Sequence, residues 1–311
     1  MAWQAWRGKV RRGGVGLGVA GGARRGEPRR VKAGHGVAGR ATHGVTRRSA
    51  AWQARDGEPA TLKGKEPKMT LMDSLIRTTH LAPPKMIVYG QPGVGKTTFA
   101  ASAGAILIDC ENGAGAVRGL VRTPYLQSWP EMRQWLVELV SSPPEGIPAV
   151  AVDTIDWMIQ RIVEHVVVDL DGKSPKDVTN TLGTAHGGYF KAREIVQNIV
   201  YRDLLPMLNA LTSGGVAIIL LAHAANTKMT TPEGFDIRLA APDLPQWIAP
   251  PFIEWADAVL YAARDGDQRK MMTQGTNVVL AKNRYSLPAE VPLSWTALMA
   301  AMSDSATSRS T

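Results

Sequence analysis

The sequence of 311 residues has a single cysteine, Cys110, and no long hydrophobic run. One cysteine excludes an internal disulfide framework and favours a reducing, cytoplasmic compartment. The longest apolar stretch, residues 215–222, is too short to cross a bilayer, and the N-terminus has no apolar segment long enough for a secretory signal. We therefore expect a cytoplasmic protein that makes no membrane contact.

Two further absences narrow the chemistry. The six histidines and the cysteine show no spacing typical of metal ligands, so a zinc site is not expected. No Ser-His-Asp or Cys-His arrangement is apparent either, which leaves nucleophilic hydrolases without support.

The net charge of +9 belongs to one end of the chain. Residues 1–68 carry 16 basic and 4 acidic residues, net +12, whereas the remaining residues carry 20 basic and 23 acidic residues, net −3. Residues 1–68 are also rich in Gly and Arg and have almost no apolar periodicity, so they cannot bury enough surface to fold alone. We predict a disordered basic tail.

Three interpretations of this tail stay open. It is an electrostatic arm for nucleic acid, or an organelle-targeting segment, which its arginines favour and its glycines oppose. In the third interpretation translation starts at Met69 or Met72, and the first 68 residues are an over-extended reading frame.

Beyond the tail, short apolar runs alternate with helical patterns, which is typical of an α/β fold with a mainly parallel sheet and helices on both faces. The hydrophobic content of 44% is ample for such a core. The predicted strands are residues 86–89, 105–108, 148–152, 216–221, 259–261 and 278–281. The predicted helices are 129–140, 155–170 and 190–211, the last kinked at Pro206, and 226–248 is expected as a protruding loop or hairpin. We assign residues 69–295 to one folded domain and 296–311 to a C-terminal tail.

The most informative motif is a phosphate-binding loop. Residues 90–97 read G-x-x-x-x-G-K-T between an apolar run and a predicted helix start. The glycines allow backbone angles that turn successive N–H groups toward a β-phosphate. Lys96 would reach the β- and γ-phosphates, and the Thr97 hydroxyl would coordinate Mg²⁺. The predicted nucleotide-binding residues are Gly90, Gln91, Pro92, Gly93, Val94, Gly95, Lys96, Thr97 and Thr98. The alternative is a Gly-rich turn with an exposed lysine.

Phosphoryl hydrolysis also needs a metal-binding group and a base for the attacking water, both at the carboxyl ends of strands beside the loop. Asp153 follows the apolar run 149–152, as a Walker B aspartate that holds Mg²⁺ through water would, although Asp-Thr after a strand is also a common helix cap. Glu111 follows the second predicted strand. Asp109 beside it is a supporting partner or a strand-end cap, and Cys110 is expected to pack as a small buried hydrophobe.

Taken in order, these motifs make the chain similar to RecA-like ATPases, above all to the phage-encoded "AAA family" ATP-binding proteins that accompany single-strand annealing and recombination systems. The resemblance runs from about Leu81 to Pro288. It implies a RecA-like P-loop NTPase fold with ATP and Mg²⁺, and the sequence contains no Asn-Lys-x-Asp guanine motif. It further implies that Glu111 activates water, that Asp153 holds Mg²⁺, and that His223 senses the γ-phosphate after the fourth predicted strand.

The resemblance also implies a role for two more cations. Lys282-Asn-Arg284 resembles the Lys-x-Arg element of RecA-like helicases and recombinases, whose cations reach the γ-phosphate, often across a subunit boundary. The chain continues with Tyr-Ser-Leu-Pro instead of the usual Gly, which departs from the helicase pattern. The alternative for these two cations is a surface pair without a catalytic part, and for His223 a hydrogen-bonded place at the rim of the core. The resemblance also implies a homo-oligomer with sites at subunit interfaces.

The candidate contact for single-stranded DNA is the loop from Asn226 to Leu244, because RecA-like proteins place a DNA-contacting loop after strand four. It carries Lys228, Phe235 and Arg238, and an aromatic ring beside cations suits base stacking with phosphate contact. The alternative is a solvated hairpin, since the net charge of −3 beyond the tail argues against a broad basic surface.

Three functions remain in competition. The first is a Mg²⁺-dependent ATPase that acts on single-stranded DNA in phage-type recombination or replication, together with proteins of those systems. The second is a nucleotide-gated switch that binds DNA or a partner with little hydrolysis. The third, a small-molecule P-loop kinase, is disfavoured because no Arg-rich lid segment follows the third helix.

Overall fold

The computed structural model describes residues 81–171, 181–230, 234 and 236–308. The basic tail predicted for residues 1–68 and both candidate translation starts lie outside this range, and they stay predictions.

The described residues form a ten-stranded sheet in the order β10-β8-β7-β1-β5-β4-β2-β3, with β6 paired to β5 and β9 paired to β7. The strands are β1 (Lys85–Gly90), β2 (Ile106–Asp109), β3 (Val121–Arg122), β4 (Ala149–Asp153), β5 (Ala217–Thr230), β6 (Asp236–Pro242), β7 (Ala258–Asp265), β8 (Gln268–Met272), β9 (Lys282–Asn283) and β10 (Glu290–Pro292). The pairings that link β7, β1, β5, β4, β2 and β3 are all parallel, whereas β8 and β10 run antiparallel at one side. The mostly parallel sheet confirms the predicted α/β class. Its order places β1 between β5 and β7.

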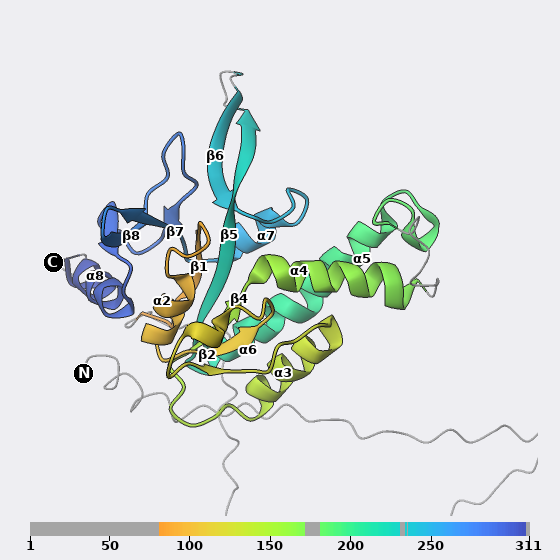
Figure 1. Cartoon of the computed structure of the whole chain (residues 1–311), viewed down its shortest axis with the longest axis horizontal. Coiled ribbons are helices and arrows are strands. Elements are labelled where there is room, and N and C mark those ends of the chain that lie inside the picture. The colour runs from red at the N-terminus through yellow and green to blue at the C-terminus, as the bar shows by residue number, and fades with distance from the viewer. Residues whose placement is uncertain (1–80, 172–180, 231–233, 235, 309–311) are drawn as a thin grey trace, which may run out of the picture. The chain divides into compact units, whose positions relative to one another are not determined.

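Helices cover both faces of the sheet (Figure 1). They are α2 (Lys96–Ser102), α3 (Trp129–Ser141), α4 (Ile155–Glu164), α5 (Lys191–Ile199), α6 (Leu205–Ser213), α7 (Ala249–Trp255) and α8 (Trp295–Ser308). Ile87 and Tyr89 of β1 face the layer that contains α3 to α7, while Met86 and Val88 face the layer that contains α2 and α8. This alternation follows from the two-residue period of a strand.

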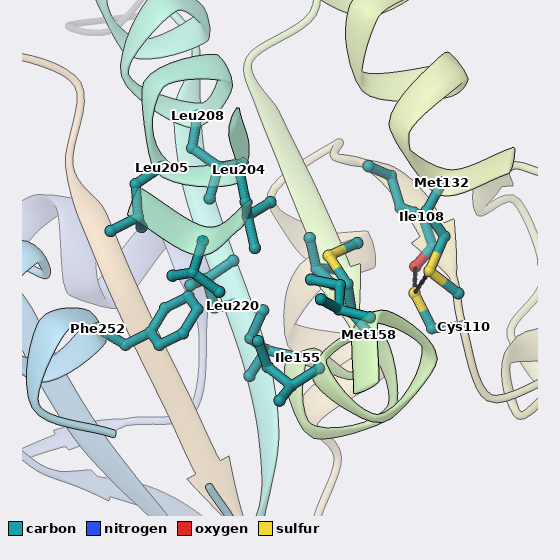
Figure 2. Close-up of a cluster of buried hydrophobic side chains, with 14 of the residues drawn as sticks. Ile108, Cys110, Met132, Ile155, Met158, Leu204, Leu205, Leu208, Leu220 and Phe252 are labelled. Atoms are coloured by element: carbon teal, nitrogen blue, oxygen red, sulfur yellow. Dashed lines mark hydrogen bonds between the residues drawn. The ribbon is translucent and has the colours of Figure 1, made fainter. Parts of the chain in front are cut away.

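The larger layer is closed by fully buried side chains. Figure 2 shows Ile155 and Met158 of α4 beside Leu220 of β5, with Phe252 of α7 and the leucines of the α6 region on the other side. Each such side chain contributes about 1.5–3 kcal/mol relative to an exposed one. The central strands are therefore held rigidly by the packing of this layer. Among the described residues, no helix is both long and apolar enough to cross a membrane.

The helix predicted over 190–211 is present, but its hydrogen-bonding pattern changes along its length. It consists of α5, a π-helical segment over Val200–Leu204, and α6. Pro206 stands in the first turn of α6, where its missing N–H and its ring are accommodated by the wider turn before it. The helix predicted over 155–170 likewise continues beyond α4 as a π-helical segment, His165–Leu170.

Two expectations near the C-terminus are corrected. Residues 296–311 were expected as a tail, but α8 runs to Ser308 and buries Leu298 and Met302 against the α2 side of the sheet. Its Ala, Met and Leu residues are strong helix formers. The strand predicted over 278–281 is reduced to an isolated bridge between Val279 and Ala240, followed by the two-residue β9.

The segment after the fourth core strand is a hairpin, as expected. The first part of β5 pairs with β1 and β4 inside the sheet, and residues 224–230 pair with residues 236–242 of β6 alone. The hairpin extends away from the body of the sheet (Figure 1).

Candidate functional site

The phosphate loop connects β1 to α2 and is shaped by three glycines. Gly93 and Gly95 have φ values of 76° and 110°, in the region that favours glycine. Gly90 is required for a different reason, because a Cβ there would lie 2.4 Å from the carbonyl oxygen of Ala262 in β7. The loop can therefore curl at two positions and lie flush against the neighbouring strand at a third.

Lys96 points into this loop. Its side chain is almost fully buried, and its Nζ donates to the carbonyl oxygens of Gly90 (2.9 Å) and Gln91 (3.2 Å). Burial lowers the pKa of Lys96, while the charges of Asp153 and Glu111 oppose that shift. The ammonium thus lies across the loop, where phosphate oxygens could replace the two carbonyl acceptors.

Thr97 and Asp153 bring two hard oxygen donors together. The Thr97 hydroxyl donates to Oδ2 of Asp153 at 2.8 Å, and only 4% of Asp153 is exposed. Burial is the main cause that raises the pKa of Asp153 to about 6, with smaller contributions from Glu111 and Asp109, while the Thr97 hydrogen bond and Lys96 lower it. A hydroxyl and a carboxylate beside a phosphate loop fit Mg²⁺, which prefers oxygen ligands and is bound by few protein groups together with phosphates.

Glu111 contacts His223 and contributes to the electrostatic environment of Asp153. The distance from Nε2 of His223 to Oε1 of Glu111 is 3.5 Å, and about a third of the Glu111 side chain is exposed. On its other side, the His223 ring nitrogen Nδ1 lies 2.7 Å from Oδ2 of Asp156. The backbone N–H of His223 also donates to Oδ1 of Asp156, at 3.2 Å. Asp156 therefore fixes the ring that faces Glu111.

Asp156 was missed by the sequence analysis. It belongs to the first turn of α4, three residues after Asp153, where an acidic residue is favourable on its own account. The sequence held one signal for Asp156, because this residue lies close to the predicted Walker B aspartate. Its contact with His223, 67 residues away, could only come from the packing of α4 against β5.

The turn that carries Glu111 is held by Asp109. Oδ1 of Asp109 accepts from the backbone N–H groups of Glu111 (3.3 Å) and Asn112 (2.7 Å), and Oδ2 accepts from Arg122 at 2.8 Å. Asp109 thus caps the end of β2 and also supports Glu111. The two roles that the sequence analysis gave as alternatives therefore occur together. Arg122, from the short β3, was not predicted.

Cys110, between Asp109 and Glu111, packs into the layer that contains α3 to α7. Its Sγ lies 3.8 Å from the carbonyl oxygen of Ile108 and 3.9 Å from Sδ of Met132 (Figure 2). Burial raises the pKa of the thiol well above its ordinary value. The expectation that Cys110 packs as a small buried hydrophobe agrees with this environment.

Lys282 and Arg284 do not lie at the phosphate loop of their own chain. Nζ of Lys282 donates to the carbonyl oxygens of Ile253 (2.7 Å) and Ala256 (3.0 Å) at the end of α7, and Arg284 pairs with Asp257 at 2.9 Å. Both stand near the amino end of β7, whereas the phosphate loop follows the carboxyl end of β1, the parallel neighbour of β7. The structure therefore does not bring them to the phosphate loop of their own chain, and a role across a subunit boundary stays a prediction. Their positive charge stabilises carbonyl groups at a helix end.

Two of the three DNA candidates lie on the hairpin. Lys228 of β5 and Arg238 of β6 are directly opposite each other, and both are exposed. Lys228 also pairs with Asp236 at 2.7 Å. Phe235 lies outside the described residues.

A glycine-shaped phosphate loop after the central strand, with a buried lysine, a Thr–Asp pair and a carboxylate on adjacent strand ends, defines a P-loop nucleoside triphosphatase. The family model described as "AAA domain" matches residues 82–285. The chain therefore belongs to this family of P-loop ATPases, and this membership indicates nucleotide binding and ATPase activity. No curated protein matches the chain.

Proposed function

We propose that this protein is a Mg²⁺-dependent, RecA-like ATPase that acts on single-stranded DNA in phage-type recombination or replication. The observation that carries the proposal is the convergence of Lys96, the Thr97–Asp153 pair and the Glu111–His223 pair at one edge of the sheet. A phosphate-binding turn without catalytic work would not need a buried carboxylate and a partly exposed one beside it. In the proposal the protein works as a homo-oligomer, with recombination or replication proteins as partners.

Each group has a role that suits its position. Lys96 offsets the negative charge of the β- and γ-phosphates, and Thr97 with Asp153 would hold Mg²⁺, which supplies charge stabilisation to the transferred phosphoryl group. Glu111 accepts a proton from the attacking water, for which its partial exposure leaves access. His223 is fixed by Asp156 and contacts Glu111, and in the proposal it responds to the terminal phosphate.

The hairpin supports the DNA part of the proposal. Lys228 and Arg238 place two exposed cations directly opposite each other, with Asp236 paired to Lys228, and both side chains are accessible to the phosphates of a strand. Lys228 and His223 stand on the same continuous strand, β5. A ligand contact with the hairpin can therefore be transmitted along this strand to His223, which faces Glu111.

The double variant Lys228→Ala with Arg238→Ala tests this part. We expect its affinity for single-stranded oligonucleotide at low salt to fall by about 10- to 100-fold, and the slope of log affinity against log salt to shrink by roughly 1.4, because two phosphate contacts are lost. Nucleotide affinity without DNA should be unchanged. Fluorescence anisotropy with a labelled oligonucleotide over a salt series gives both quantities.

The matched control is Lys191→Ala with Arg202→Ala, which removes the same charge from exposed positions in the α5 region. Equal losses in both double variants would mean that only overall charge matters, and unchanged binding in the hairpin variant would refute the hairpin as the contact. Absence of any DNA binding or DNA-stimulated turnover in the wild-type protein would remove DNA from the proposed function.

A further inference from the structure

The hairpin of β7 and β8 places an arginine against the phosphate loop. A Cβ added to Gly95 would lie 2.8 Å from Nη1 of Arg269, 3.4 Å from its Cδ and 3.5 Å from its Cζ. The guanidinium therefore lies directly on the backbone of the loop residue that precedes Lys96. Neither sequence pattern nor family resemblance pointed to Arg269.

Arg269 differs from the neighbouring cations of the hairpin because they have acidic partners and it has none among the described residues. Arg264, its cross-strand partner, donates to the Gly266 carbonyl oxygen and pairs with Asp267, and Lys270 pairs with Asp265 at 3.1 Å. Within the described part of the chain, the Arg269 guanidinium makes no hydrogen bond or ion pair. Its side chain is exposed, and its charge persists at any physiological pH. Among the residues that the structure describes, its five N–H donors therefore have no acceptor, and they lie beside a loop built to receive phosphate.

The location of Arg269 decides which part of a nucleotide it meets. Glu111 follows β2, Asp153 is the last residue of β4 and His223 lies within β5, and these three strands are all on one side of β1. Arg269 stands on the opposite side, on β8 next to β7. A triphosphate whose terminal phosphate faces Glu111 and His223 would direct its α-phosphate and nucleoside toward the β7–β8 side.

We propose that Arg269 binds the α-phosphate of the nucleotide held by the phosphate loop. The planar guanidinium can donate two parallel N–H bonds to phosphate oxygens, which a lysine cannot do. This inference rests on the proposed nucleotide site and adds a contact from the side of the sheet opposite to the catalytic carboxylates. Because ATP and ADP share the α-phosphate, the contact is present with both.

The test is a pair of binding titrations of the full chain with ADP and with ATP in the presence of Mg²⁺. Arg269→Ala is expected to raise the Kd for both nucleotides by about 10- to 100-fold and by the same factor, as expected for a lost charge-assisted hydrogen bond. Arg269→Lys should recover part of the affinity. Arg264→Ala, which removes the cross-strand arginine of the same hairpin, should leave both Kd values at the wild-type level.

Each outcome is decisive. Unchanged affinity for both nucleotides in Arg269→Ala would overturn the inference, and so would a loss confined to ATP, which would indicate a γ-phosphate contact instead. If the wild-type protein binds neither ATP nor ADP, the proposed nucleotide site itself fails. Thermal unfolding without nucleotide should give the same Tm for wild type and Arg269→Ala, because the side chain is exposed.

Discussion

Replacement of Glu111 by Gln is expected to lower steady-state ATP turnover by about 10²- to 10⁴-fold and to leave ATP affinity within about a factor of two. Glutamine keeps the shape of the side chain but cannot accept the proton of the attacking water. The backbone contacts of Asp109 that hold this turn do not involve the Glu111 side chain, so the turn should keep its structure. Turnover is measured as phosphate release, and affinity by titration with a fluorescent ATP analogue.

Glu138→Gln, at an exposed position of α3, is the matched control and should hydrolyse ATP at the wild-type rate. Wild-type turnover in Glu111→Gln would show that another group activates water. If the wild-type protein itself binds ATP with negligible turnover, and Glu111→Gln behaves in the same way, the nucleotide-gated switch replaces the ATPase.

Replacement of Asp153 by Asn is expected to abolish Mg²⁺-dependent turnover and yet to stabilise the fold without nucleotide by roughly 1–3 kcal/mol at pH 8. The native pKa of Asp153 is raised from 3.8 to about 6, so above pH 6 the folded protein carries a buried charge that the unfolded chain would solvate. Asn removes this charge and keeps an oxygen that can accept from Thr97.

The sign of the pH dependence follows from the same shift. The wild-type carboxyl group takes up its proton as pH falls through about 6, so the stability advantage of Asp153→Asn shrinks there and vanishes below about pH 4, where both states are neutral. Urea unfolding at a series of pH values measures the difference. The exposed Asp304→Asn serves as control, and an advantage that is absent at pH 8 or grows toward low pH would contradict the assignment.

The parts of the site that follow from the sequence are those encoded by consecutive residues. The loop from Gly90 to Thr97 has a fixed spacing, and its glycines adopt the angles that the motif requires. Asp153 and Glu111 each follow an apolar run, and the carboxyl ends of parallel strands meet at one edge, so their convergence near Lys96 could be anticipated. The strand order agrees with this expected convergence, because only β5 lies between β1, which leads into the loop, and β4, which carries Asp153.

The remaining contacts depend on packing between distant segments. Asp156 meets His223 only because α4 packs beside β5, and Arg269 reaches Gly95 only because the β7–β8 hairpin folds beside the phosphate loop. The place of Lys282 could not be read from its local pattern either, since the pairing of β9 with β7 places it at the end of α7, away from the phosphate loop of its own chain. Local patterns give residue types, but the register of antiparallel additions to the sheet fixes where they lie.

The most direct test of the account is the rate of phosphate release from ATP by the full chain with Mg²⁺, with and without single-stranded DNA, beside Lys96→Ala. The account predicts Mg²⁺-dependent release that DNA stimulates and that disappears in Lys96→Ala, because the proposal makes this buried ammonium the phosphate contact at the centre of the loop. Equal release by the wild-type protein and Lys96→Ala, or no release from a wild-type protein that binds ATP, would contradict it.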